Sequence, residues 1–179
     1  MRHSIILFFF LVIIYSCQTQ EMGSWSLIPQ PNSISVSMGS FNFDQGINIS
    51  LSDSSLNQLV LFFKEKFYQL GITVNSVSNN SIELKVVSPD QIKPEGYELS
   101  IEKQKITLSA SDSSGIFYGL MTIWQELKFS KSKAIPCGLI KDEPRFTYRG
   151  FMLDESRHFF GKEKVMQLID LMSIFKLNK

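Results

Sequence analysis

The chain has 179 residues, 44% of them apolar, which is enough to bury the core of about one domain, or of one domain and a fragment of another. Its 18 basic and 17 acidic residues leave a net charge of +1. Because nucleic-acid-binding domains usually carry an excess of positive charge on one face, this balance gives no support for a nucleic-acid partner.

Residues 1 to 20 have the pattern of a targeting segment. A basic start at Arg2 and His3 precedes the apolar run SIILFFFLVIIY, from Ser4 to Tyr15. This run is too short for a comfortable membrane span, which takes about 20 residues, but it suits the apolar region of a secretory signal. The sequence therefore predicts a secreted or cell-envelope protein.

The apolar run ends in IYSC, which resembles the cleavage site of bacterial lipoproteins. An aliphatic residue stands at the third place before Cys17, and the small Ser16 stands just before it. The resemblance implies a signal over residues 1–17, lipidation of Cys17, membrane attachment through that lipid and a polar tether over 18–24. A plain signal peptide cut nearby is the alternative, and a single-pass anchor is a third.

The sequence has few residues that could bind a metal or form a disulfide. Cys137 is the only other cysteine, so it has no partner within the chain if Cys17 carries lipid. The only histidines are His3, in the leader, and His158. Two cysteines cannot build a zinc site without histidine or carboxylate ligands, so we predict no structural metal.

Two half-buried strands and one helix are predicted over residues 25 to 71. The segments 33–38 (SISVSM) and 47–52 (INISLS) alternate polar and apolar residues, and turn-forming residues separate them. From Leu56 the apolar residues recur at helical spacing, at positions 56, 59, 60, 63, 67 and 70. We expect this amphipathic helix to be capped by residues 53–55 and to end at Gly71.

Further strands are predicted at 71–77 (GITVNSV) and 82–87 (IELKVV), followed by a hairpin over 96–111 with its turn at 103–105. A second helix is predicted within 111–127, where Ile116, Leu120, Ile123 and Leu127 form one stripe. Gly115 and Gly119 share a face of this helix. Each costs about 1 kcal/mol relative to alanine in a helix interior, so we expect the helix backbone to approach a sheet closely there.

Residues 128–143 are interpreted as a connector, because this segment is rich in Lys and Ser and contains Pro136 and Gly138. We therefore predict one domain over 25–137 and a second unit over 138–179. The second unit contains a strand at 146–154 (FTYRGFMLD) and a helix at 162–176. A single strand–helix unit is a small part of a barrel of such units, which takes roughly 250 residues.

The segment DEPRFTYRGFMLDESRHFF, followed by a helix that ends in KLN, resembles the start of the catalytic barrel of glycoside hydrolase family 20, the β-N-acetylhexosaminidases. The matching positions are Asp142, Pro144, Arg145, Phe146, Arg149, Gly150, Asp154, Ser156, Arg157, His158, Lys176, Leu177 and Asn178. Upstream, residues 95–127 resemble the end of the family's small N-terminal domain. The resemblance implies an α+β domain, with an antiparallel sheet and two helices, followed by the first βα unit of a (β/α)8 TIM barrel.

Arg157 matches the family arginine that holds the ring hydroxyls of the terminal sugar. A guanidinium suits this role because its forked donors are fixed and always charged, so it can grip two neighbouring hydroxyls. The alternative is an arginine paired with Asp154 for structural reasons. We expect Asp154 to orient Arg157.

The other basic residues of this segment are expected to be structural. Arg145 and Arg149 would brace the base of the barrel and the domain junction. His158, next to Phe159, is expected to be packed rather than catalytic.

The resemblance implies hydrolysis of terminal non-reducing N-acetylhexosamine from glycans or chitin-type oligosaccharides, with no metal or organic cofactor. In the family's retaining mechanism the substrate's acetamido oxygen attacks the anomeric carbon, a Glu protonates the leaving oxygen and an adjacent Asp orients the acetamide, an exception to the usual two-carboxylate scheme. The pairs Asp142–Glu143 and Asp154–Glu155 do not match those positions. We expect the catalytic pair beyond residue 179, and this N-terminal fragment to be inactive alone.

A function from a different class is also open. The chain could be a non-catalytic surface lipoprotein whose α+β domain binds glycan or a protein partner.

Overall fold

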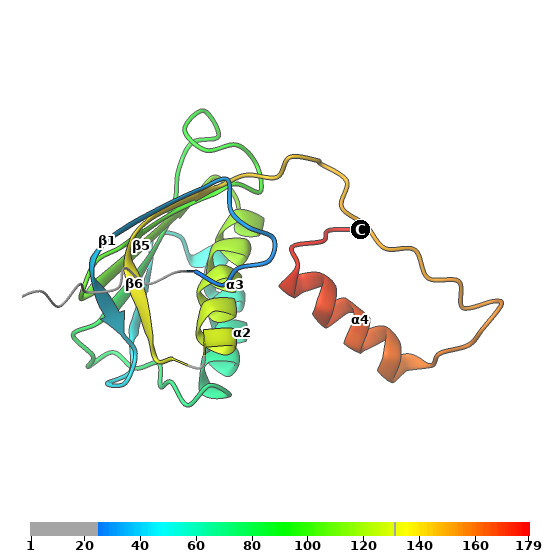
Figure 1. Ribbon diagram of the computed structural model, residues 1–179, viewed down its shortest axis with the longest axis horizontal. Coiled ribbons are helices and arrows are strands. Elements are labelled where there is room, and N and C mark those ends of the chain that lie inside the picture. The colour runs from blue at the N-terminus through cyan, green and yellow to red at the C-terminus, as the bar shows by residue number, and fades with distance from the viewer. Residues whose placement is uncertain (1–24, 131) are drawn as a thin grey trace, which may run out of the picture.

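Residues 25–130 and 132–179, which the computed structural model describes, contain one six-stranded sheet with helices α2 and α3 on one face and helix α4 beyond them (Figure 1). The strand order is β1-β6-β4-β5-β3-β2. The strands are β1 (Ser33–Asn42), β2 (Asn48–Leu51), β3 (Ser81–Val86), β4 (Tyr97–Ile101), β5 (Lys105–Ala110) and β6 (Ala134–Asp142).

The sheet is mixed, so the prediction of an antiparallel sheet is wrong for two of its five strand pairings. β1, β6, β4 and β5 pair antiparallel, whereas β2 pairs with β3 and β3 with β5 in parallel. A parallel neighbour needs a crossover connection, and helix α2 supplies it between β2 and β3.

The first predicted helix is confirmed. A short 3-10 turn, η1 (Ser54–Leu56), leads into α2 (Asn57–Tyr68). The Asp53 carboxylate accepts the Ser55 amide at 2.8 Å, as a cap does, and Gly71 has a φ of 71° just beyond the helix. The predicted apolar stripe faces the core through Leu56, Val60, Phe63 and Phe67.

The predicted strand at 71–77 is wrong. Within that segment, all of which the structure describes, only Val74 makes a β-bridge, to Ile47. The side chain of Asn75 accepts the amides of Val77 and Ser78 and closes a local turn. These amides are therefore not available to extend a sheet.

The hairpin and the second helix are confirmed. β4 and β5 pair with Leu99 opposite Leu108, and helix α3 spans Ser113–Ser130. A Cβ atom added at Gly115 would collide with the carbonyl oxygen of Gly96, and one at Gly119 would collide with the side chain of Leu108. Both glycines therefore allow the close contact between helix and sheet that their spacing predicts.

The interpretation of 128–143 as a connector is wrong. Residues 128–130 belong to the end of α3, and β6 is an internal strand that pairs with β1 and β4. The predicted boundary between residues 137 and 138 falls inside this strand. Gly138, with a φ of 152°, pairs with Val36 where the register of β1 and β6 shifts, and the extra residues of this bulge lie on β1, between Val36 and Ser40.

The predicted strand at 146–154 is also wrong, because the structure describes these residues and assigns none of them to a strand. The Arg149 carbonyl accepts the Lys179 amide at 3.2 Å, and the Phe151 amide donates to the Lys179 carbonyl at 3.0 Å. This is the hydrogen-bond pattern of one parallel β-bridge at Gly150. A strand of a parallel sheet is defined by its neighbours, and among the described residues the segment pairs only with 178–179.

The predicted last helix is confirmed as α4 (Lys162–Ile174), which ends slightly before the expected residue 176. In Figure 1 the chain leaves β6, runs outward and returns through α4, so that the C-terminus lies beside the start of the same segment. None of the helices in the described ranges has the length and apolar character that a membrane span requires.

Candidate functional site

The loop at 154–157 holds the predicted sugar-binding arginine. One carboxylate oxygen of Asp154 accepts the backbone amides of Ser156 and Arg157, at 3.0 and 3.1 Å, and so closes the turn. Its other oxygen lies 3.3 Å from Nε of Arg157. The structure thus brings together the two residues that we expected to act as a pair.

The orientation of Arg157 leaves its forked end open to solvent. Its side chain is 91% exposed, and among the described residues no protein atom bonds its two terminal nitrogens. Asp154 holds only the Nε edge of the guanidinium, so both terminal nitrogens remain available to a ligand.

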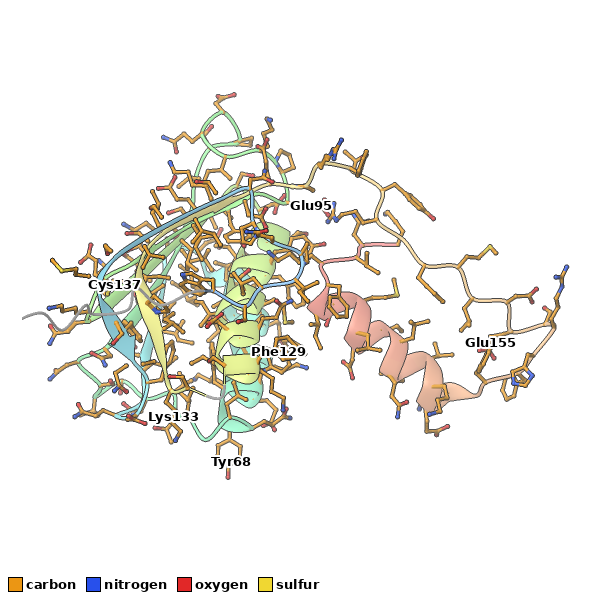
Figure 2. All side chains as sticks on the ribbon, viewed as in Figure 1. Tyr68, Glu95, Phe129, Lys133, Cys137 and Glu155 are labelled. Carbon is orange, nitrogen blue, oxygen red and sulfur yellow. The ribbon has the colours of Figure 1, made fainter. Side chains whose placement is uncertain are left out.

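Two neighbouring residues lie away from this pair. His158 is exposed and packs edge-on against Phe160, with ring centroids 4.6 Å apart, rather than against Phe159. The Glu155 carboxylate accepts the amide of Phe160, and Figure 2 shows it in the part of the chain far from the sheet.

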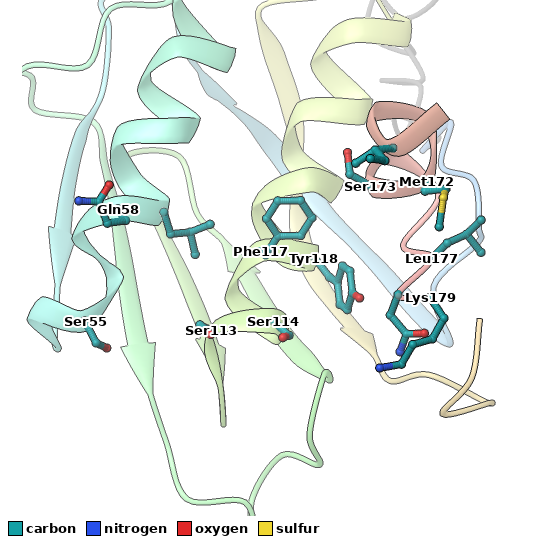
Figure 3. Close-up of a pocket in the computed structure, with 13 residues that line it drawn as sticks. Ser55, Gln58, Ser113, Ser114, Phe117, Tyr118, Met172, Ser173, Leu177 and Lys179 are labelled. Carbon is teal, nitrogen blue, oxygen red and sulfur yellow. The ribbon is translucent and has the colours of Figure 1, made fainter. Parts of the chain in front are cut away.

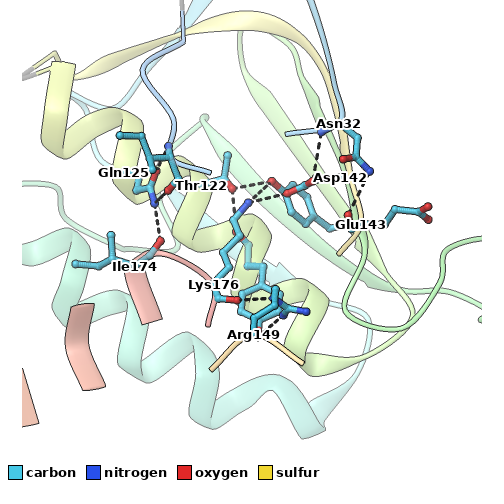
Figure 4. A network of polar contacts seen from close by, with 11 residues as sticks. Asn32, Thr122, Gln125, Asp142, Glu143, Arg149, Ile174 and Lys176 are labelled. Carbon is cyan, nitrogen blue, oxygen red and sulfur yellow. Dashed lines mark hydrogen bonds and ion pairs between the residues drawn. The ribbon is translucent and has the colours of Figure 1, made fainter. Parts of the chain in front are cut away.

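Figure 4 shows a buried polar chain that sequence reasoning missed, centred on Lys176. Its ammonium donates to Asp142 Oδ2 at 2.8 Å and to the Tyr97 hydroxyl at 2.9 Å. The Thr122 hydroxyl donates to the Tyr118 carbonyl, so the Tyr97 hydroxyl is the donor in its 2.7 Å bond to Thr122. The one sequence signal was the position of Lys176 in the KLN motif.

Arg149 joins the βα unit to the α+β domain. Its guanidinium donates to Glu95 Oε2 at 3.0 Å, to the Lys176 carbonyl at 2.8 Å and to the Tyr118 hydroxyl at 3.2 Å. The expected bracing role of Arg149 at the domain junction is confirmed. Arg145 was expected to share this role but does not. It is exposed, and its guanidinium carbon lies 5.3 Å from the ring centroid of Phe146 in its own segment.

Burial shifts the pKa of residues in this cluster; neighbouring charges and hydrogen bonds oppose that shift at Lys176 and Glu95 and add to it at Tyr97. Burial lowers the pKa of Lys176, although the charge of Asp142 opposes the shift. Burial, followed by the charge of Asp142, raises the pKa of Tyr97 well above its ordinary value. Burial alone would raise the pKa of Glu95, but hydrogen bonds from Arg149 and Asn178 outweigh it and lower that pKa.

Two hollows lie next to these elements. A cavity of about 300 Å³ is bordered by the cluster itself, through Glu95, Tyr97, Arg149 and Lys176. A wider hollow of about 700 Å³ separates α2 and α3 from α4 (Figure 3). Its lining combines aromatic and apolar side chains with small polar ones and Lys179, and it includes no carboxylate side chain.

Both Asp–Glu pairs are engaged within the chain. Asp142 is bound by Lys176, and Glu143 lies 2.8 Å from Lys93, while Asp154 and Glu155 accept amides of their own loop. The expectation that the catalytic pair lies outside this chain stays a prediction.

The next features are the possible metal ligands and the cysteines of the described residues. Within residues 25–130 and 132–179, no three His, Cys, Asp or Glu side chains are grouped to hold a metal ion. Cys137 is buried, and burial raises the pKa of its thiol. Cys17 lies outside the described residues.

Two family models match the chain one after the other. The model described as glycosyl hydrolase family 20, domain 2, matches residues 24–143, and the catalytic-domain model of the same family matches 146–179. The chain belongs to glycosyl hydrolase family 20. Its α+β part is the family's domain 2, and its βα unit is the start of the catalytic domain, so the predicted fold class is confirmed apart from the sheet's parallel pairs.

Relatives and solved structures agree with this membership. The family 20 chain is 33% identical over 168 residues to a β-hexosaminidase of Porphyromonas gingivalis, covering 86% of this chain and 22% of the relative. It is 28% identical over 165 residues to the N,N'-diacetylchitobiase of Vibrio harveyi, and the match covers 90% of this chain and 18% of that relative.

One solved structure shares the fold closely. The family 20 exo-β-N-acetylglucosaminidase of Vibrio harveyi, in complex with N-acetylglucosamine, superimposes with a TM-score of 0.73 at 33% identity. The match covers 85% of this chain and 24% of that one. The chain therefore spans about a quarter or less of the length of these proteins.

Proposed function

We propose that the protein carrying this chain hydrolyses terminal N-acetyl-β-hexosaminides at their non-reducing ends. Membership of family 20 supports the reaction class. The names of the relatives, β-hexosaminidase and diacetylchitobiase, and the N-acetylglucosamine bound in one similar structure support the sugar class. Chitin-type oligosaccharides and glycans that end in N-acetylhexosamine are the substrates this implies.

The observation that carries the proposal is the Asp154–Arg157 pair. Asp154 holds Nε of Arg157 at 3.3 Å and leaves the terminal nitrogens in solvent. A guanidinium held on one edge presents two parallel donors on the other, which matches two adjacent ring hydroxyls. The ion pair with Asp154 favours this orientation before the sugar arrives, which lowers the entropy lost on binding.

Arg157 would bind and orient the terminal sugar, without transferring a proton. The acetamide-assisted attack and protonation of the leaving oxygen need an Asp–Glu pair, and the two such pairs in this chain are engaged in internal contacts. We place the acid chemistry in the catalytic pair expected beyond residue 179.

The test is the hydrolysis of an aryl N-acetyl-β-glucosaminide by the full product of the gene, with the corresponding aryl glucoside as the control. We expect release of the phenol from the first and little from the second, because the reaction uses the acetamido group. Binding of N-acetylglucosamine without hydrolysis would contradict the proposal and favour a non-catalytic glycan-binding lipoprotein.

We also propose that the protein is anchored in the cell envelope through lipid on Cys17, from the leader pattern at residues 1–17. Metabolic labelling with a fatty acid tests this. Cys17→Ser should abolish incorporation, whereas Cys137→Ser, at the only other cysteine, should leave it unchanged. Labelling that persists in Cys17→Ser would rule out the anchor.

A further inference from the structure

Two residues at the junction hold an unfavourable backbone conformation. Among the residues that the structure describes, Glu95 and Lys176 are the non-glycine residues with positive φ, at 63° and 58°. The left-handed region costs an L-residue free energy that glycine does not lose. A side chain retained at such a position is therefore expected to have a role that glycine could not fill.

Lys176 occupies the position after α4 where helices usually place glycine. The Leu177 amide donates to the Met172 carbonyl at 2.9 Å and the Lys176 amide to the Ser173 carbonyl at 3.3 Å, which together make a Schellman motif. The Lys176 side chain is only 8% exposed, and its ammonium meets Asp142 at the end of β6. The strained backbone thus turns a buried charge toward the α+β domain.

Glu95 lies in the α+β domain, in the turn before β4, and its side chain contacts the βα unit. Its carboxylate accepts from Arg149 Nη1 with one oxygen and from Asn178 Nδ2 with the other, both at 3.0 Å. Arg149 and Asn178 are themselves paired, because the Asn178 amide donates to the Arg149 carbonyl at 2.7 Å. A single carboxylate of the α+β domain therefore holds both segments that meet in the first parallel bridge.

We propose that Glu95 and Lys176 form an interdomain clamp, with Arg149, Asn178 and Asp142 as their partners, through which the α+β domain sets the register of the first parallel pairing in the catalytic domain. Both are positioning residues. They act on the sugar-binding loop only through the segment that leads to it. The proposal concerns assembly of the domain and does not depend on the glycosidase activity.

The contacts of Asn178 explain why the clamp selects one register. Its side-chain oxygen accepts the Arg149 amide at 3.1 Å, and its amide nitrogen donates to the Thr147 carbonyl at 2.9 Å as well as to Glu95. A slip by one residue would move Asn178 away from all three partners. Glu95 and Arg149 would then keep poorly paired charges in a site where their side chains are 22% and 17% exposed.

An exposed ion pair of the same region provides the matched control. Lys93 and Glu143 meet at 2.8 Å, as Lys176 and Asp142 do, but their side chains are 74% and 42% exposed. A pair this open to water should contribute little. Glu143→Gln removes the charge of such a pair and leaves the clamp in place.

Amide hydrogen exchange of the 179-residue chain tests the clamp. Glu95→Gly and Lys176→Gly suit the positive φ and delete only the side chain, so a folding defect from backbone strain is not expected. In both we expect residues 144–179, and the Phe151 amide in particular, to exchange at least tenfold faster. In Glu95→Gly, β4 and β5 should exchange as before; in Lys176→Gly, which also leaves the buried Asp142 unpaired, β4 and β5 should lose less protection than residues 144–179. Glu143→Gln should match the unchanged chain.

Two results would overturn the proposal. One is an unchanged exchange rate of Phe151 in both glycine variants. The other is an equal loss of protection in β4, β5 and residues 144–179, which would mean that the residues only stabilise the α+β domain. Glu95→Gln is a milder variant, because it removes the charge but keeps a side chain that can form hydrogen bonds. The exchange rate of the Phe151 amide in this variant should fall between those of the unchanged chain and Glu95→Gly.

Discussion

The ammonium of Lys176 lies 2.8 Å from the carboxylate of Asp142, in a site where their side chains are 8% and 14% exposed. The pair joins the end of α4 to the end of β6 and so connects the two parts of the chain that separate family models match. Taking both charges out of water is costly, and the attraction offsets this only while both partners are present.

Removing one partner of this pair should therefore destabilise the protein strongly. We expect Lys176→Met to lower the free energy of unfolding by about 3–5 kcal/mol, because Asp142 is left as a buried unpaired carboxylate. Urea denaturation followed by the fluorescence of the buried Trp124 measures the change. The double variant Lys176→Met/Asp142→Leu should recover much of the loss, and two losses that simply add would contradict the pairing.

Acid should weaken the junction through Glu95. The Glu95 pKa in the folded chain is below its ordinary value of 4.5. The carboxylate therefore contributes stability that is fully present above 4.5 and is lost as the pH falls through the lower, folded pKa. Urea midpoints measured from pH 7 down to pH 3 should decline less steeply in Glu95→Gln than in the unchanged chain.

This comparison also removes the contribution of other acids. The pKa values of Asp53 and Glu83 are lowered too, by hydrogen bonds, but both residues are unchanged in the Glu95→Gln variant. Parallel pH curves for the two proteins would show that Glu95 has the same pKa in the folded and unfolded chain.

Gly119→Ala should destabilise the protein despite the higher helix propensity of alanine. Propensity favours alanine by about 1 kcal/mol, but the new methyl group would collide with Leu108 on β5, and overpacking of this kind costs about 1–3 kcal/mol. We expect a net loss of stability in thermal or urea unfolding. Leu108→Val should relieve part of the collision, so a double variant no more stable than Gly119→Ala would argue against this contact.

Arg157→Ala should impair the proposed hydrolysis by the full gene product. Two charge-assisted hydrogen bonds of about 1.5–3 kcal/mol each would be lost, so kcat/KM should fall on the order of a hundredfold or more. Arg145→Ala is the matched control, because Arg145 is an exposed arginine of the same segment that stacks on Phe146. An unchanged kcat/KM in Arg157→Ala would remove this residue from the sugar site.

The sequence by itself determined the elements whose signals are local. The cap at Asp53 with the stop at Gly71, the hairpin of Leu99 and Leu108, and the apolar stripes of α2 and α3 all depend on residues a few positions apart. The family resemblance could also be recognised from the sequence alone, because it rests on a dense local motif. The Asp154–Arg157 pair belongs to this group, since both residues lie in one turn.

Only the tertiary structure decided which strands are neighbours and which charges are buried. β6 contains Pro136 and Gly138, which locally indicate a break, yet it is an internal strand because β1 and β4 supply partners on both sides. The segment at 146–154 is predicted as a strand but pairs only with 178–179 among the described residues. Lys176 is buried because Asp142 and Tyr97, far away in the sequence, meet it there. Strand pairing and charge burial depend on such distant partners, and local sequence patterns do not contain them.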